Sequence, residues 1–390
     1  MAPRPPRIAE ADRRRIVMSA TLADDRTIVE RILNHIDHKS TDLSSGVWHE
    51  PVDHYVSQAR FSAEINRVLR RTPTPFCPSA ALPDAGSYLA RDAALVPIVA
   101  MRDSDGTVRA FRNACRHRGV QLVEGSGCKK ALTCRYHAWT YGLDGRLRGI
   151  PDEHGFPGID KNSYGLIPVA TVEKHGMIFV TQDGPEAPDA DIASMPDLFG
   201  SGWRLFTTVE QEFAANWKIV AEGFLEGYHI RSTHQDTFYP LQYDNINVIE
   251  AFGRNSRISF PYRRIEKLRS VAPAERRTAG MLTQVYHIFP NVMIATFPTN
   301  TIMTVLEPLA VDRTRLVTYT LSNLTEDREG RAAISQGRDF VTAGAAEDRD
   351  MACAAQRGLA SKANHVFTFG LFEGAIRHFH QNLEAAIAIA

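Results

Sequence analysis

Two pairs of cysteine and histidine stand close together in this sequence of 390 residues. Cys115 and His117 form a C-x-H pair, and Cys134 and His137 form a C-x2-H pair that follows after 16 residues. Two thiolates and two imidazoles can hold a zinc ion, or an iron–sulfur cluster in which cysteines bind one iron and histidines the other. In a Cys2His2 zinc finger both cysteines precede both histidines, whereas here each pair supplies one of each. This order favours the cluster and leaves structural zinc as the alternative.

A second group of possible metal ligands follows about 90 residues later. His229 and His234 are separated by four residues, and Glu226 lies three residues before the first histidine. Two histidines and one carboxylate with open coordination positions are typical of non-haem Fe(II) oxygenases. Glu226 is so near His229 that it is better placed to orient the imidazole by a hydrogen bond than to bind the metal. The third ligand must then come from elsewhere.

Three acids further along the chain are candidates for that third ligand. Glu347, Asp348 and Asp350 stand where we expect a helix over residues 347–359 to begin. A helix N-terminus favours acidic side chains for electrostatic reasons alone, so a solvated helix start is the structural interpretation of all three. Residue type and spacing do not choose among them.

The segment that carries the two histidines predicts a helix over residues 213–229. At about 100° per residue, Glu222, Glu226 and His229 fall within roughly 60° of one another and share one face. His229 and His234 differ by roughly 140°, so they do not converge on one ion from a straight helix. We therefore expect the helix to end near residue 230 and His234 to return from a loop.

The other elements that must position these groups follow from hydrophobic periodicity and turn residues. An apolar run at 278–306 is interrupted by Pro290 and Pro298, which indicates two strands and a turn instead of a membrane helix. Helices are expected at 6–40 and 374–387, hairpins at 96–111 and from 140 onward, strands at 169–172 and 177–181, a linker at 183–196, and a long hairpin at 305–309 and 316–321.

Composition excludes several classes of protein. Lys plus Arg and Asp plus Glu each number 45, so the net charge is zero, which argues against nucleic-acid or anionic-membrane binding. Five cysteines are too few for a disulfide scaffold. The N-terminal stretch lacks the apolar core of a secretory signal. We expect a cytoplasmic protein that binds neither nucleic acid nor membrane.

Both ligand groups have flanking residues typical of one family. The first group continues as Arg118-Gly119 and Ala138-Trp139, and the second fits acid-x3-acid-x2-His-x4-His from Glu222 to His234. The chain therefore resembles the Rieske non-haem iron oxygenases, or aromatic-ring-hydroxylating oxygenase α-subunits, over roughly residues 45–390. The resemblance implies a Rieske [2Fe–2S] cluster on Cys115, His117, Cys134 and His137, a mononuclear Fe(II) on His229, His234 and Asp348, and a bridging carboxylate at Glu226.

The resemblance also implies an α+β fold. A β-sandwich Rieske domain would lie beside a larger catalytic domain, whose central antiparallel sheet is flanked by helices. Chains of this family usually form head-to-tail trimers, here a homotrimer or an α3β3 assembly, in which one subunit's cluster serves the neighbour's iron. The expected divisions are an N-terminal helical segment at 1–47 that packs on the catalytic domain, the Rieske domain at 48–170 and the catalytic domain at 171–390.

The implied activity is that of a terminal oxygenase component. It would use O2 and electrons from NAD(P)H, delivered by a reductase and possibly a ferredoxin, to hydroxylate or dihydroxylate an aromatic or related small organic substrate. Glu226 stands where ring dioxygenases usually have aspartate, and Gly223 where the family often has asparagine. The glutamate looks more like the choline and carnitine monooxygenase branch. The alternative is thus a monooxygenase that demethylates or cleaves a quaternary-ammonium or methoxy compound.

Two interpretations from other classes are a Rieske electron carrier without catalysis and a zinc-stabilised binding module. The second ligand group, and the length of chain that surrounds it, argue against the carrier. Candidate walls for a substrate pocket are Phe224, Phe238, Tyr239, Tyr286, Phe297 and His287.

Overall fold

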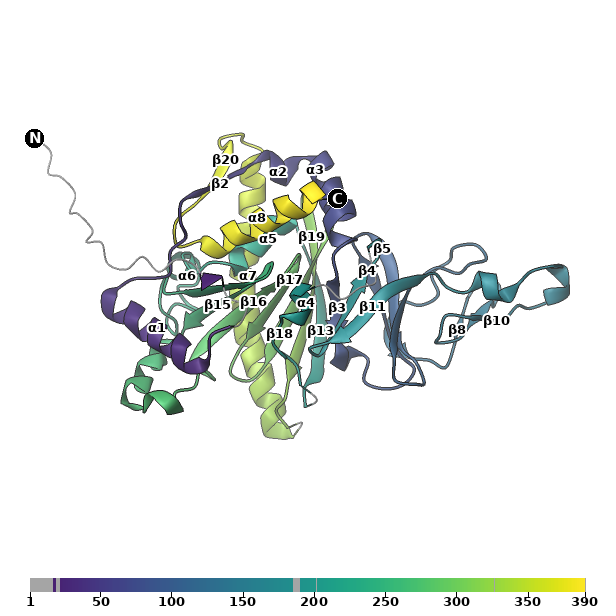
Figure 1. Ribbon diagram of the computed structural model, residues 1–390, viewed down its shortest axis with the longest axis horizontal. Helices are drawn as coiled ribbons and strands as arrows, with labels where there is room; N and C mark the ends of the chain where they lie inside the picture. Colours follow the sequence, from purple (N-terminus) through teal and green to yellow (C-terminus); the bar gives the residue numbers. More distant parts are fainter. Residues whose placement is uncertain (1–16, 19–21, 185–189, 201, 326, 390) are drawn as a thin grey trace, which may run out of the picture.

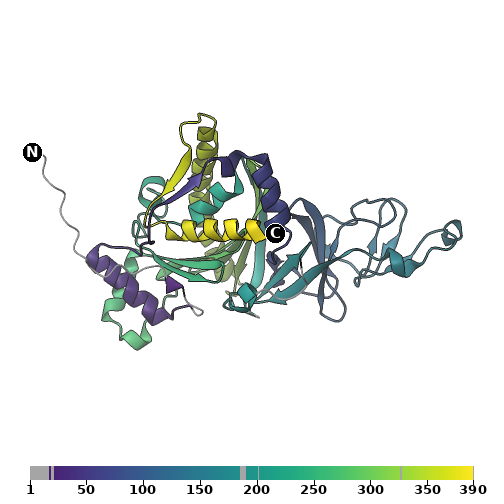
Figure 2. The ribbon, with the colours of Figure 1, turned by 45° about the horizontal axis from the view of Figure 1, so that its top comes forward.

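The protein has two parts along its longest axis, a larger part of helices and sheet and a smaller part built mainly from strands (Figure 1). A view turned by 45° keeps the two parts distinct, with the teal strands of the smaller part projecting away from the helices (Figure 2). Helices and antiparallel sheets in two parts confirm the expected α+β class. The computed structural model describes residues 17–18, 22–184, 190–200, 202–325 and 327–389.

An eight-stranded sheet forms the centre of the larger part. Its order is β1-β14-β15-β16-β17-β18-β19-β13, and all neighbours are antiparallel except β1 and β14. The hairpin of β18 and β19 confirms the long hairpin expected from the sequence. The strands are β1 (Val17–Met18), β13 (Arg204–Phe213), β14 (Val248–Phe252), β15 (Asn255–Pro261), β16 (Leu282–Ile288), β17 (Val292–Thr296), β18 (Thr301–Ala310) and β19 (Arg313–Ser322).

Side-chain caps begin the two helices that matter most for the site. The Asn216 side chain accepts a hydrogen bond from the backbone N–H of Lys218 at the start of α5, and Asp327 accepts one from Gly330 at the start of α7. The helices are α1 (Asp25–His38), α2 (Asp53–Val56), α3 (Gln58–Ala63), α4 (Ala190–Ala193), α5 (Trp217–Phe224), α6 (Ile230–Thr233), α7 (Arg328–Leu359) and α8 (Gly374–Ile389), with a π-helical turn at Glu64–Leu69 and a 3-10 helix at Arg263–Ser270.

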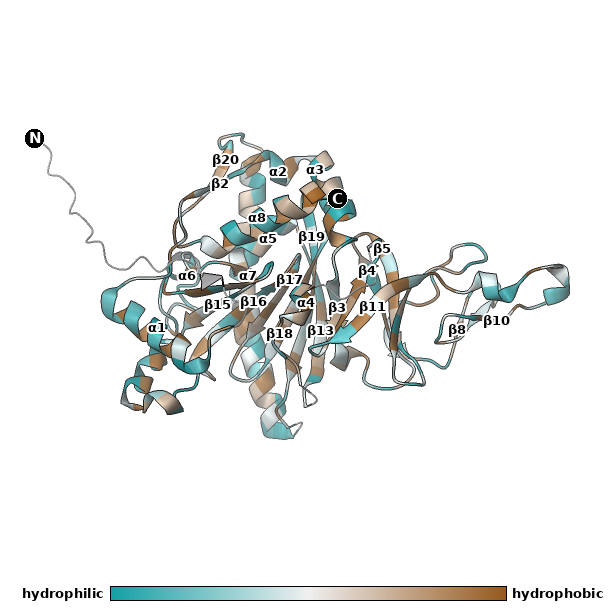
Figure 3. Ribbon diagram, in the orientation of Figure 1, coloured by the Kyte–Doolittle hydropathy of each residue, from teal (hydrophilic) through white to brown (hydrophobic). Residues whose placement is uncertain are grey.

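Both faces of the eight-stranded sheet are buried, and alternate residues of a strand serve opposite faces. In β17, Met293 and Ala295 pack with α5 and α8, whereas Val292 and Ile294 pack in a cluster shared with the smaller part. A strand covered on both faces is apolar at nearly every position, and the central strands are largely brown in Figure 3. The register of the sheet therefore fixes the position of α5, which leads into the candidate iron ligands.

The smaller part contains a seven-stranded sheet, in the order β3-β12-β11-β6-β5-β4-β7, and a three-stranded sheet, in the order β10-β9-β8. The expected hairpin of β5 and β6 turns through Asp105 and Gly106, and the φ of 83° at Gly106 suits glycine. The strands are β3 (Thr74–Pro78), β4 (Ser87–Ala93), β5 (Val96–Arg102), β6 (Val108–Arg112), β7 (Gly125–Cys128), β8 (Leu132–Thr133), β9 (Thr140–Tyr141), β10 (Leu147–Gly149), β11 (Pro168–Lys174) and β12 (Met177–Thr181).

The chain enters the smaller part later than the expected boundary at residue 48. Strand β2 (Trp48–Pro51) pairs with β20 (Val366–Phe369) of the larger part, and the π-helical turn after α3 packs against α8. At the other end, β12 pairs with both β3 and β11. We therefore propose that the first domain runs from β3 to β12, about residues 74–181, and that residues 48–69 belong with the catalytic part.

Several expected elements differ from the structure. The helix expected at 6–40 is represented by α1; Val17–Met18 is a strand, and residues 6–16 lie outside the described residues. Residues 278–306 carry β16, β17 and the start of β18, because the chain reverses twice there. Part of the expected linker at 183–196 is helix α4, and residues 185–189 are not described. Within the described residues, no helix is both long and apolar enough to cross a membrane.

The helix expected at 347–359 begins much earlier, at Arg328. The cap at Asp327 explains this start, because its side chain satisfies a backbone N–H of the first turn. Glu347, Asp348 and Asp350 therefore lie inside a long helix, and the interpretation of these acids as a solvated helix start is wrong.

A buried ion pair joins the π-helical turn to α5. Lys218 and Glu64 are both fully buried, with Nζ to Oε1 at 2.8 Å, and Glu64 also accepts hydrogen bonds from Trp217 and Arg60. We expect Glu64→Ala to destabilise the protein by about 3–5 kcal/mol, because it leaves the Lys218 ammonium buried without its counter-charge. Thermal unfolding measures the effect, with Glu30→Ala as the exposed control. Equal melting of the two variants would contradict this account.

Candidate metal centres

Helix α5 ends at Phe224, which is earlier than the sequence predicts. Gly227 approaches its neighbours so closely that a Cβ there would lie 2.6 Å from Asn247 Oδ1. The Glu226 carboxylate accepts hydrogen bonds from the backbone N–H groups of Tyr228 and His229, which fixes a turn before α6. The prediction that Glu222, Glu226 and His229 share one helix face is therefore wrong, although His234 does follow a helix end.

Glu222, the first acid of the pattern, contacts different residues from Glu226, the second. Glu222 Oε1 accepts a hydrogen bond from the Tyr55 hydroxyl at 2.5 Å and lies 2.8 Å from His380 Nε2. All three side chains are buried, and they join α5 to α2 and α8. Glu222 thus stabilises the helix that precedes the ligands.

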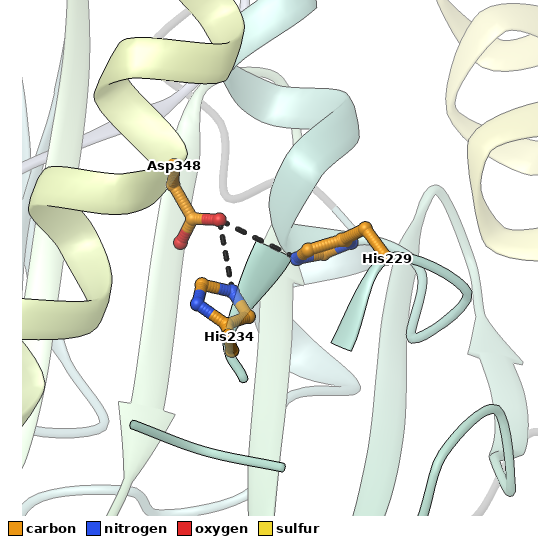
Figure 4. Close-up of side chains that lie close together, drawn as sticks. All are labelled: His229, His234 and Asp348. Atoms are coloured by element: carbon orange, nitrogen blue, oxygen red, sulfur yellow. Dashed lines mark ion pairs between the residues drawn. The ribbon is translucent and has the colours of Figure 1, made fainter. Parts of the chain in front are cut away.

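Both histidines of the second group meet Asp348 (Figure 4). Asp348 Oδ1 lies 3.0 Å from His234 Nε2 and 3.4 Å from His229 Nε2. Donor atoms that each lie about 2.1 Å from one metal ion in adjacent positions are roughly 3 Å apart. The two imidazoles and the carboxylate therefore fit a single ion, and their chemistry is that of a 2-His-1-carboxylate site.

The other nitrogen of each imidazole is bound by a second carboxylate. His229 Nδ1 hydrogen-bonds to Glu226 Oε1, and His234 Nδ1 lies 2.7 Å from Glu347 Oε2, which also accepts a hydrogen bond from Thr237. Although burial opposes it, the bonds to Asp348 and Glu226 raise the pKa of His229 to about 10. Carboxylates that bind Nδ1 orient the ring and leave Nε2 free for a metal.

The three downstream acids thus have three different environments. Asp348 points to the histidines, Glu347 holds His234, and Asp350 lies outside the group beside Arg349, at 3.3 Å. The role of Glu347 was not predicted from the sequence. In the sequence Glu347 is marked only by standing close to Asp348, and Asp350 stands close to Asp348 as well.

The first group of candidate ligands lies on two similar loops of the smaller part. Each loop closes with a hydrogen bond from the fourth residue after the cysteine, Gly119 to Cys115 and Ala138 to Cys134. Gly119 and Ala138 both have positive φ, at 77° and 57°. The loops bring the imidazole rings of His117 and His137 to a centroid distance of 4.7 Å.

The donor atoms of these loops fit a cluster with two thiolate and two imidazole ligands. Both cysteine side chains are buried and form no disulfide, and the His117 Nδ1 atom is buried without a hydrogen-bond partner among the described residues. Trp139 stacks on His117 with ring centroids 4.9 Å apart, and the Tyr141 hydroxyl lies 3.3 Å from Cys115 Sγ. An orphaned imidazole nitrogen among thiols is explained when it binds a metal.

Two family models match successive parts of the chain. The model described as "Rieske [2Fe-2S] domain" matches residues 72–170, and the one described as "Ring hydroxylating alpha subunit (catalytic domain)" matches residues 201–389. The chain belongs to the Rieske non-haem iron oxygenases. It is the oxygenase component of such a system, an oxidoreductase that uses a Rieske [2Fe–2S] cluster and a non-haem iron.

This Rieske oxygenase is similar to proteins of two kinds. It is 26% identical to the carnitine monooxygenase oxygenase subunit of Escherichia coli (strain K12) over 366 residues, which cover 86% of this chain and 93% of that protein. It is 33% identical to the naphthalene 1,2-dioxygenase large oxygenase component of Pseudomonas aeruginosa over 193 residues, 45% of this chain and 42% of that one.

Solved structures share the fold of this Rieske oxygenase. A quaternary ammonium Rieske monooxygenase in complex with L-carnitine matches with a TM-score of 0.74 and 22% identity, covering 88% of this chain and 96% of that one. Naphthalene 1,2-dioxygenase from Rhodococcus sp. bound to indole matches with a TM-score of 0.70 and 17% identity, covering 93% and 98%.

The aromatic residues predicted as pocket walls have different surroundings in this Rieske oxygenase. Phe238 lies beside the candidate iron site, with its ring 4.7 Å from that of His234. Tyr286 belongs to the buried core. His287 is also fully buried in the core, and burial lowers its pKa to about 4. Phe224, Tyr239 and Phe297 are partly buried against the core.

We expect Tyr141→Phe to lower the reduction potential of the cluster. The variant removes a hydrogen bond to the sulfur of the candidate ligand Cys115, and such bonds stabilise the more negative, reduced state. A potentiometric titration followed by electron paramagnetic resonance measures the change. Tyr164→Phe is the control, since Tyr164 packs on Trp139 in the same domain. Equal potentials in both variants would overturn the role of the hydroxyl.

We expect Glu347→Ala to weaken iron binding at the second site by about ten- to a hundredfold, because His234 loses the carboxylate that orients it. Titration of metal-depleted protein with Fe(II) gives the dissociation constant. Asp350→Ala is the matched control on the same helix, since this side chain is exposed and pairs only with Arg349 among the described residues. Unchanged affinity in Glu347→Ala would show that His234 needs no such partner.

Proposed function

We propose that this Rieske oxygenase hydroxylates a carbon bonded to the nitrogen of a quaternary ammonium compound, with iron bound by His229, His234 and Asp348. The convergence of two carboxylate-oriented imidazoles on Asp348 carries the proposal, because it leaves coordination positions open for O2 beside a substrate. In the same proposal Cys115, His117, Cys134 and His137 bind the cluster. When bound, the cluster supplies electrons and the iron activates O2.

Two observations support the quaternary ammonium class over an aromatic ring. In sequence, the carnitine monooxygenase subunit of Escherichia coli matches over 93% of its length, whereas the naphthalene dioxygenase component matches over less than half of each chain, although a solved naphthalene dioxygenase shares the fold over most of its length. Glu226 also occupies the position at which ring dioxygenases usually carry aspartate. Ring hydroxylation is the second candidate, and the partial match to naphthalene dioxygenase is what favours it.

The reaction balances as a monooxygenation. One oxygen atom of O2 enters a C–H bond next to the nitrogen, and the other leaves as water after two electrons and two protons are taken up. The C–N bond of the product then breaks; the nitrogen keeps the electron pair, and the hydroxyl loses its proton to form a carbonyl. The products are a tertiary amine, an aldehyde and one proton.

The electrons would pass between subunits. The loops with the cluster ligands and the segment around α6 lie towards opposite ends of the molecule along its longest axis (Figure 1). His137 is exposed, and Glu226, whose side chain is 11% exposed, is followed two residues later by the exposed Tyr228, so both sites lie near the surface. A head-to-tail homotrimer, or an α3β3 assembly, would place His137 of one subunit against Glu226 of the next. A reductase, with or without a ferredoxin, would reduce the cluster from NAD(P)H in the cytoplasm.

The substrate class is tested by O2 uptake and NADH oxidation with a surrogate reductase. We expect L-carnitine, glycine betaine or choline to stimulate both, with one aldehyde and one tertiary amine formed per O2. Formation of a diol from naphthalene or indole, with no response to any quaternary ammonium compound, would favour ring hydroxylation instead.

We expect Glu226→Gln to retain about three irons per chain and yet lose coupled turnover, because the bridge between His137 and His229 requires a carboxylate that both imidazoles can donate to. Iron quantification and the ratio of product to NADH measure the two effects. Asp236→Asn, at an exposed acid two residues after His234, is the control. Wild-type coupling in Glu226→Gln would overturn the bridge.

A further inference from the structure

A cavity of about 510 Å³ lies between α7, the loop after α6 and the beginning of the 3-10 helix. Its size suits a small organic molecule. Its lining includes proline, leucine and aromatic side chains, and no acidic residue among those described. The lining residues on which the argument depends are Tyr262, Arg263, Arg264, Phe340 and Val341.

The cavity and the candidate iron ligand share one face of α7. Val341 lines the cavity, and Asp348 follows seven residues later. Seven residues make two helical turns, so the two side chains point within about 20° of the same direction and lie roughly 10 Å apart along the axis. The cavity therefore ends about two helical turns before Asp348, on the same face of the helix.

Phe238 stands at the junction between the cavity and the ligands. Its ring lies 5.3 Å from that of Phe340, which lines the cavity, and 4.7 Å from that of His234. A Cβ at Gly344 would approach the Phe238 ring to 2.4 Å, so α7 lacks a side chain where this ring rests. Phe340 thus gives the cavity an aromatic wall on the side of the metal ligands, which suits a quaternary ammonium group.

The opposite wall carries two positive charges. Arg263 lies over the ring of Tyr239 at 5.1 Å, and Arg264 over that of Tyr262 at 4.7 Å. Within the described residues neither guanidinium forms an ion pair with a carboxylate, and both residues are exposed. Two unpaired guanidinium groups repel a simple cation and bind a carboxylate strongly.

We propose that this cavity is the substrate site and that it selects quaternary ammonium compounds that also bear a carboxylate. The carboxylate binds Arg263 and Arg264, and the ammonium group lies against Phe340 and Phe238, on the side of the iron. This inference rests on the proposed function and adds that the substrate carries an anionic group, which a choline-like cation or an aromatic hydrocarbon lacks.

The test compares Arg263→Gln/Arg264→Gln with wild type in the full holoenzyme. We expect KM for glycine betaine and L-carnitine to rise about ten- to a hundredfold with kcat nearly unchanged, since a lost bond to a charged group weakens binding on this scale. KM for choline should stay constant or fall. Arg269→Gln, on the same 3-10 helix but paired with Asp37, should behave as wild type.

Equal changes in KM for choline and for the carboxylated probes, or no change in KM at all, would overturn the inference and leave the proposed function standing. If no quaternary ammonium compound is oxidised, the proposed function fails. Calorimetric titration with glycine betaine then tests the binding site independently of activity. Binding that is lost in the double variant would support the site, and wild-type protein that does not bind glycine betaine would overturn it.

Discussion

The candidate iron site depends on carboxylates that bind the Nδ1 atoms of two imidazoles. Glu226 and Glu347 turn His229 and His234 so that both Nε2 atoms face Asp348. Three carboxylates around two imidazoles concentrate negative charge in a largely buried place, and a divalent cation compensates this charge directly. The arrangement of α5, the following turn and α7 can be understood as the means of keeping these five side chains together.

The central sheet supplies the rigidity that this convergence needs. It is covered by helices on one face and by the strands of the Rieske domain on the other, so that both domains share one packed layer. A buried ion pair between Arg91 and Glu307, at 2.6 Å, ties β4 of one domain to β18 of the other. The cluster loops, in contrast, lie at the far end of their domain, where a partner can reach them.

Local groups were predictable from the sequence, whereas groups joined through the fold were not. Cys115 and His117 share one short loop, so residue type and spacing suffice to indicate a metal site. Asp348 comes more than 100 residues after His234, and only the family pattern selects it from its neighbours. The role of Glu347 and the end of α5 depend on contacts between distant segments, such as that of Gly227 with Asn247.

Gly344 separates two structural requirements on α7. Asp348, the candidate ligand on α7, must stay fixed, but the space in front of it must change when a protein acquires a new substrate. Because Phe238 rests on a residue without a side chain, the position of its ring is set one turn away from Asp348. A larger residue at position 344 would therefore have to displace the Phe238 ring, without replacing any of the candidate metal ligands.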